Sequence, residues 1–235
     1  MGKNLHIRLL VAGVMSLAPG AMAQEVSTSY DCGREFVTFE NDAPQSAMIW
    51  ADYGASFDKF LDVKAYSNGT SKARRPWQCT ELVHRFVRKV YGFPSQLGLS
   101  MGHGKSLAAG IADHFDGKTS VSPAIAPYKV KLEHFENGTG ECAPVVGSLI
   151  SVKVGSFGHA GVLRSLKPVG WNRWEGRLFA QDGTPHSQLG ATMGRDKVMF
   201  QKIGEDKWQG AWISASGRVY DLSGWTNPVV VGVIE

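Results

Sequence analysis

Residues 75–93 read RPWQCTELVHRFVRKVYGF, and this stretch predicts the helix around which the rest of the chain is organised. Pro76 is typical of a helix start, and Gly92 is typical of a helix end. Counted from Cys79, apolar residues recur with the 3.6-residue period of a helix that buries one side. That stripe consists of Leu82, Val83, Phe86 and Val90. Cys79 is therefore expected at the N-terminal tip of the buried side.

Cys79 has the sequence environment of a reactive thiol. The start of a helix carries unpaired N–H groups and a positive partial charge, which favour a thiolate over a thiol. In such positions the pKa of a cysteine falls from about 8.5 towards roughly 3.5–7.5. We therefore predict that Cys79 is a nucleophile. The alternative is a buried structural thiol, because cysteine is among the most buried residue types.

The N-terminal residues 1–23 predict a secretory signal peptide. Lys3 and Arg8 form a basic start, residues 9–17 are apolar, and the sequence AMA at 21–23 matches a cleavage signal. No later run approaches the roughly 18 apolar residues of a membrane span, so no integral membrane segment is expected. The predicted location is periplasmic or secreted.

The charge balance argues against a nucleic-acid partner. The formal net charge is +4, and removing Lys3 and Arg8 from the 25 basic residues leaves 23 against 21 acidic ones. Basic residues do cluster at Arg85, Arg88 and Lys89, but they lack the aromatic interleaving of nucleic-acid surfaces. We read them as the solvated face of the helix.

The three cysteines predict one disulfide and no metal site. An oxidising compartment pairs thiols, and the simplest pairing is Cys32 with Cys142, which leaves Cys79 outside the bridge. The sequence has no C-x-x-C motif, and none of four histidines has metal-ligand spacing. These histidines are His103, His114, His134 and His186. No metal or cofactor is expected.

The pattern along the chain predicts helices first and strands afterwards. Residues 24–69 read as an N-terminal extension, with a short strand at 36–39 and one broken helix or two short helices at 46–63. A second helix is predicted at 106–115, and residues 118–145 read as a long surface connection. Alternating apolar residues then predict strands at 148–152, 157–163, 177–181, 197–203, 208–213, 218–222 and 229–234. The predicted class is α+β, with the helices packed on an antiparallel sheet in a domain spanning 70–235.

His159 is the predicted base that would act on Cys79. It lies on the predicted strand 157–163, where a period of two places it on one face with Gly161 and Leu163. The small residues Ala160 and Gly161 leave room for a helix to approach. If the Cys79 helix packs there, the imidazole can reach the sulfur, as covalent acyl transfer requires.

The group that would orient His159 is left open between two neighbours. Gln181 and Asp182 follow one another at the end of the strand 177–181, so their side chains point to opposite faces. An aspartate would also stabilise an imidazolium by charge, whereas a glutamine could only fix the ring and its tautomer.

Three segments, in this order, resemble the landmarks of CHAP domains, the cysteine- and histidine-dependent amidohydrolase/peptidase members of the NlpC/P60 and papain-like group. They are QCTE at 78–81, PVVGSLI at 144–150 and GHAGV at 158–162. The resemblance implies a papain-like fold, Cys79 as nucleophile, His159 as base and a third polar group on the next strand. The family has a glutamate there and an asparagine two residues on, whereas this chain has Gln181 and Gly183, with Asp182 between them.

The expected function is that of an exported cysteine amidase or endopeptidase that hydrolyses an amide bond in peptidoglycan or a related glycopeptide. One alternative is a non-catalytic wall-binding or inhibitory module, and another is an amidase that acts on a different small amide or a protein. Nothing in the sequence specifies an immunity or inhibitor protein as partner.

Overall fold

A computed structural model describes residues 25–42, 54, 56–66, 78–96, 101–181, 197–214 and 217–234. The predicted signal peptide and residues 46–53 of the predicted broken helix lie outside these ranges. The described residues form two helices and eleven strands: β1 (Val26–Asp31), β2 (Arg34–Phe39), β3 (Ser56–Phe60), β4 (Val63–Tyr66), α1 (Cys79–Val90), α2 (Leu107–His114), β5 (Tyr128–Glu136), β6 (Leu149–Val152), β7 (His159–Gly170), β8 (Arg173–Phe179), β9 (Lys197–Gly204), β10 (Lys207–Ile213) and β11 (Val219–Val233).

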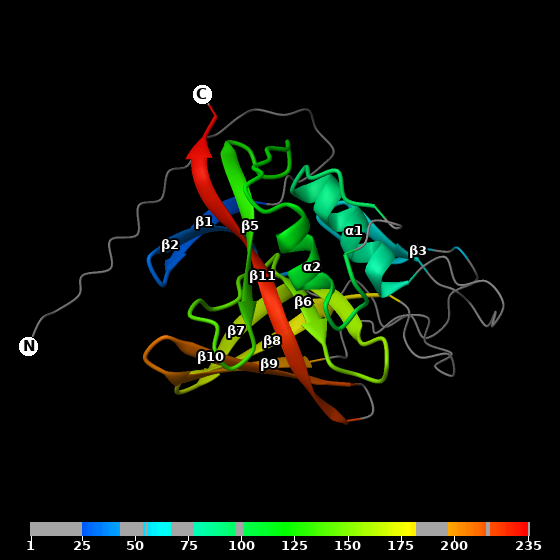
Figure 1. Cartoon of the computed structure of the whole chain (residues 1–235), viewed down its shortest axis with the longest axis vertical. Helices are drawn as coiled ribbons and strands as arrows, with labels where there is room; N and C mark the ends of the chain where they lie inside the picture. The colour runs from blue at the N-terminus through cyan, green and yellow to red at the C-terminus, as the bar shows by residue number, and fades with distance from the viewer. Residues whose placement is uncertain are drawn as a thin grey trace, which may run out of the picture.

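Strands β6 to β11 form a closed six-stranded antiparallel barrel. Each strand pairs with the next along the chain, and β11 also pairs with β6, which closes the ring. β11 crosses the whole molecule (Figure 1). Beyond the barrel it continues as a partner of β5 and, through Val229 opposite Phe36, of β2. Strand β11 therefore joins every part of the main sheet.

The predicted α+β papain-like fold, with N-terminal helices packed on an antiparallel sheet, is wrong, because the described residues are mostly β-strand and the sheet closes into a barrel. The sequence pattern divided β11 into 218–222 and 229–234, since Ser223, Gly224, Asn227 and Pro228 resemble a turn. The strand instead runs through them, and the buried Asn227 accepts a hydrogen bond from Ser148 Oγ at 2.6 Å. A strand of this length has room to pair with both β10 and β6.

Two other segments also differ from the prediction. Residues 56–63, predicted as part of a broken helix, belong to the hairpin β3–β4, which spans 56–66. Its two-residue turn, Leu61 and Asp62, has positive φ at both positions. Within the predicted surface connection 118–145, β5 pairs along β11.

Many predicted elements are confirmed. The helices predicted at 75–93 and 106–115 are α1 and α2, and every predicted strand overlaps an observed one. The disulfide between Cys32 and Cys142 is also confirmed, with Cys79 outside it. The described helices have twelve and eight residues, and neither could span a membrane.

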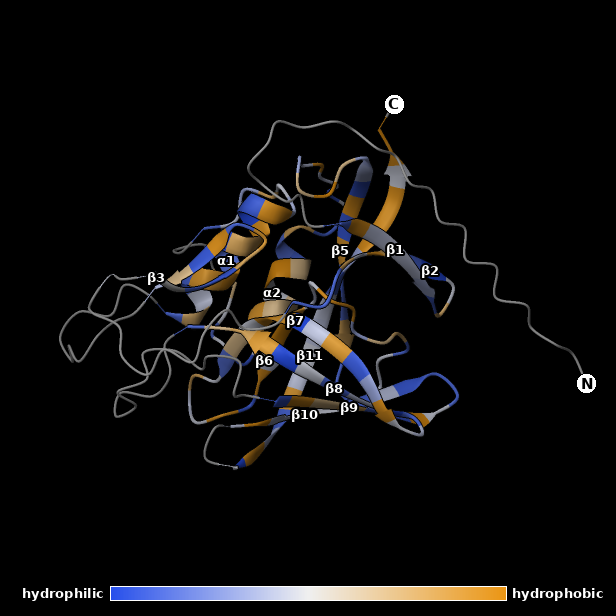
Figure 2. Cartoon of the chain, turned by 180° about the vertical axis from the view of Figure 1, so that it is seen from behind, coloured by the Kyte–Doolittle hydropathy of each residue, from blue (hydrophilic) through white to orange (hydrophobic). Residues whose placement is uncertain are grey.

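Two hydrophobic clusters lie on opposite faces of the barrel sheet. The first, here the barrel cluster, receives residues from all six barrel strands and therefore fills the barrel. It includes Ile150, Val152, Leu163, Leu178, Val198, Phe200, Trp208, Trp212, Leu222 and Trp225. The second, here the helix cluster, lies between the outer face of the barrel, the two helices and the β3–β4 hairpin. Figure 2 shows hydrophobic and hydrophilic residues alternating along α1, as expected for a helix with one buried side.

A buried arginine holds the β3–β4 hairpin against β7. The Arg164 side chain has no exposed surface, and its guanidinium lies 5.7 Å from the ring centres of Phe60 and Phe179. It pairs with Asp58 and Asp42, each at 2.5 Å. Burial raises the pKa of Asp58, and the positive charge of Arg164 opposes that rise. The pairs compensate a charge that would otherwise be buried without a counter-ion.

We expect Asp58→Asn to lower the free energy of unfolding by about 3–5 kcal/mol, because it removes a charged partner of a buried guanidinium. Asp62→Asn is the matched control, since the Asp62 side chain is 90% exposed and its pair with Lys59 is a surface pair worth about 0–1 kcal/mol. Urea unfolding of both variants measures the difference. Equal losses would contradict this account of Arg164.

Candidate functional site

The predicted nucleophile is the first residue of α1. Gln78 precedes the helix in an extended conformation and provides no side-chain cap. Cys79 is partly exposed, whereas the apolar stripe that follows it is buried. The structure therefore places a partly exposed thiol at a helix N-terminus, where the helix dipole favours a negative charge.

A fully buried amide fixes the start of this helix. Gln181 follows β8, and its Nε2 donates to the carbonyl oxygen of Gln78 at 2.9 Å and to Glu81 Oε2 at 2.7 Å. Its Oε1 accepts from the backbone N–H of Tyr66 at 3.0 Å and from Arg85 Nη2 at 3.3 Å. One side chain thus joins the end of β8, the start of α1 and the end of β4.

These bonds use the whole hydrogen-bonding capacity of Gln181. A primary amide has two donor hydrogens and an oxygen with two lone pairs, and each has a partner here. Gln181 therefore positions the helix start and has no capacity left to orient His159. The other candidate for that role, Asp182, lies outside the described residues.

His159 is buried and faces the inside of the barrel. It begins β7 directly opposite Val152 of β6, and residues opposite each other in an antiparallel pair share a face. Val152 belongs to the barrel cluster, as does Trp212, whose ring centre lies 5.4 Å from that of His159. His159 Nε2 has no hydrogen-bond partner among the described residues. Burial lowers the pKa of His159 to about 4, so the imidazole is neutral at pH 7.

Helix α1 packs on the other face of β7. Ala160 and Val162 of β7 belong to the helix cluster, together with the buried stripe of α1. Helix α1 therefore packs on β7, but it covers the face opposite to the one that carries the imidazole of His159. The period of two in the sequence predicted which residues of β7 share a face, but it did not indicate which face the helix covers.

The residues that surround His159 were not predicted from the sequence. Trp212 also contacts the ring of Tyr220, at 5.4 Å between centres. Gly104 lies over the backbone of His159, where an added Cβ would come within 2.9 Å of His159 Cα. Gly104 was a local signal for this close approach, whereas the tryptophan lies 53 residues beyond the histidine and had no signal.

No protein-family model matches this chain, and no curated protein matches it either. The chemistry of the site is therefore argued from its own residues.

We expect Gln181→Met to lower the free energy of unfolding by about 2–3 kcal/mol, because it fills a similar volume but leaves buried polar partners without bonds. Amide hydrogen exchange at the start of α1 should also become faster, since the link to Gln78 is lost. The matched control is Gln209→Met on β10, where the side chain is exposed. If both substitutions had the same effect on stability and exchange, the amide network would not fix the helix.

Proposed function

We propose that this chain is an exported cysteine-dependent hydrolase that cleaves an amide bond in peptidoglycan, with Cys79 as the nucleophile. The observation that supports this proposal most is the place of Cys79, partly exposed at the first position of a helix whose start is fixed by Gln181. The Cys32–Cys142 disulfide supports export, because such bonds persist in oxidising compartments.

The proposed reaction is a two-step acyl transfer. The Cys79 thiolate attacks the amide carbon, and backbone N–H groups at the helix start stabilise the negative charge on the carbonyl oxygen. The C–N bond then breaks as the leaving nitrogen takes a proton, which leaves a thioester on Cys79. Water attacks the thioester, releases the carboxylic acid and restores the thiol.

His159 is the proton carrier in this proposal. Its neutral imidazole at pH 7 is the form that accepts a proton from a thiol or from water. In the described arrangement its ring lies against Trp212 inside the barrel. Because the backbone fixes the face to which a strand side chain points, proton transfer to or from Cys79 requires the backbone at the start of β7 to change conformation, so that the ring leaves the barrel side.

A second candidate function is a non-catalytic wall-binding or inhibitory module. Two observations favour it: the complete set of bonds made by Gln181, and the inward position of His159. In such a module Cys79 would be a structural residue, and its replacement would leave the function intact.

Digestion of purified peptidoglycan sacculi tests the enzyme against the binding module. The wild-type chain should release soluble fragments, and Cys79→Ala and Cys79→Ser should each reduce the rate by roughly 1,000-fold or more, because both remove the nucleophile. Chromatography of the released fragments measures the rate, and circular dichroism verifies that the variants are folded. Release by the variants at the wild-type rate, or no release by any form, would contradict catalysis by Cys79.

A further inference from the structure

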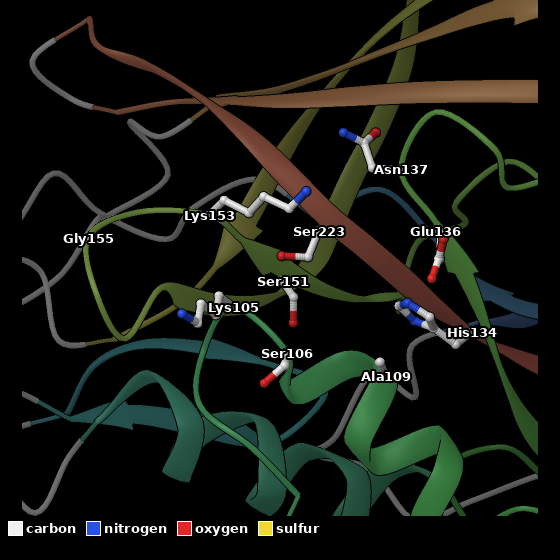
Figure 3. A pocket seen from close by; sticks show the side chains of 10 residues that line it. All are labelled: Lys105, Ser106, Ala109, His134, Glu136, Asn137, Ser151, Lys153, Gly155 and Ser223. Atoms are coloured by element: carbon white, nitrogen blue, oxygen red, sulfur yellow. The ribbon is translucent and has the colours of Figure 1, made fainter.

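A polar cavity of about 660 Å³ lies between the start of α2 and the strands β5, β11 and β6 (Figure 3). Its volume is within the range of small-molecule sites in proteins. Lys105 and Lys153 line it, together with His134, Glu136, Ser151 and Ser223. None of these residues belongs to the Cys79 site described above.

Strand pairing places opposite charges on the two flanks of this cavity. Gly224 of β11 lies opposite Glu136 of β5 on one side and opposite Ser151 of β6 on the other. Two strand spacings, about 9.5 Å, therefore separate the backbones of Glu136 and Ser151. Lys153 follows directly after β6, and Lys105 precedes α2. The ion pairs among the described residues do not include Lys105, Lys153 or Glu136.

The imidazole of His134 extends over Gly224 towards the cavity. A Cβ on Gly224 would lie 2.7 Å from His134 Cε1 and 2.9 Å from Nε2, so only glycine leaves room for this ring. Figure 3 shows the ring and the carboxylate of Glu136 on the same side of the cavity. The absence of a side chain at position 224 thus places His134 at the cavity wall.

Hydrogen bonds fix which nitrogen of His134 can accept a proton. Thr226 Oγ1 donates its single hydrogen to the carbonyl oxygen of Ala108 at 2.8 Å. It can therefore only accept from His134 Nδ1, which lies 3.1 Å away. The neutral ring carries its lone pair on Nε2. Burial lowers the pKa of His134, while Glu136, Asp113 and the backbone at Trp225 act in the opposite direction.

The floor of the cavity carries a hydroxyl without a partner. Ser223 Oγ is buried and makes no hydrogen bond with any described residue. Ser151 Oγ, in contrast, accepts from the backbone N–H of Ala108 at 2.9 Å. A buried hydroxyl without a partner is unfavourable, and a polar ligand in the cavity would satisfy it.

We propose that this cavity binds a small zwitterion, such as an amino acid or a short peptide with both ends unblocked. The carboxylate of the ligand lies at Lys105 and Lys153, and its ammonium group lies at Glu136 and His134 Nε2. Ser223 donates to the ligand from the floor. Both charges of the ligand are needed, because the two flanks of the cavity carry opposite charges.

The test is an NMR titration of the full chain carrying Cys79→Ala, which separates this site from the proposed hydrolysis. The probe is L-alanyl-L-alanine, and we expect a Kd of about 1–5 mM or tighter for a ligand of this size. The N-acetyl dipeptide and the dipeptide amide each lack one charge and should bind at least about tenfold more weakly. The amide signals of Ser151, Ser223 and Gly224 should shift.

Single substitutions assign the two ends of the ligand. Lys153→Ala and Glu136→Gln should each weaken binding of the dipeptide by roughly tenfold. Lys129→Ala is the matched control, because Lys129 is an exposed lysine on β5 outside the cavity, and it should leave the Kd unchanged. Equal binding of the blocked and unblocked dipeptides would show an anion or amine site instead and overturn the proposal, as would the absence of any shift at the cavity residues.

Discussion

The buried amide of Gln181 is the constraint on which the position of Cys79 depends. It bonds the end of β8 to the backbone of Gln78, and the same oxygen holds Tyr66 at the end of β4. Each partner is far from Gln181 in sequence. The bonds that fix the helix start can therefore form only when the barrel and the hairpin are in place. The Arg164 pairs secure that hairpin on β7, and the two networks together hold the hairpin and the start of α1 on the outside of the barrel.

The two faces of β7 determine what the site can do. The helix packs on the face of Ala160 and Val162, whereas His159 faces Trp212 inside the barrel. The helix that begins with Cys79 and the imidazole of His159 therefore lie on opposite sides of the same strand. The start of α1 is by itself enough to favour a reactive thiol at Cys79. A nucleophile paired with its base requires more, because His159 would have to leave the barrel side of β7. The polar cavity near His134 is built from other strands and depends on neither residue.

Sequence patterns predicted the features that depend on neighbouring residues or on residue counts. The apolar stripe after Cys79 specified α1, and cysteine parity specified the disulfide. The closed barrel was missed because closure depends on β11 pairing with both β10 and β6, and the residues Ser223, Gly224, Asn227 and Pro228 inside β11 resemble a turn. Alternation placed Gln181 and Asp182 on opposite faces but could not decide which of them points towards His159, and the partners of Gln181 are set by the packing of α1. The cavity depends on Gly224 and His134, which are distant in sequence and meet only through strand register.

The most direct test of the account is the pH dependence of Cys79 alkylation. The disulfide occupies the other two cysteines, so iodoacetamide labelling of the native chain reports on this thiol alone. If the helix start stabilises the thiolate, the labelling rate measured from about pH 5 to about pH 10 should reach half its maximum at or below about pH 7.5. A half-maximum near pH 8.5, the value of an ordinary thiol, or slow labelling throughout, would contradict the account of Cys79 as a nucleophile.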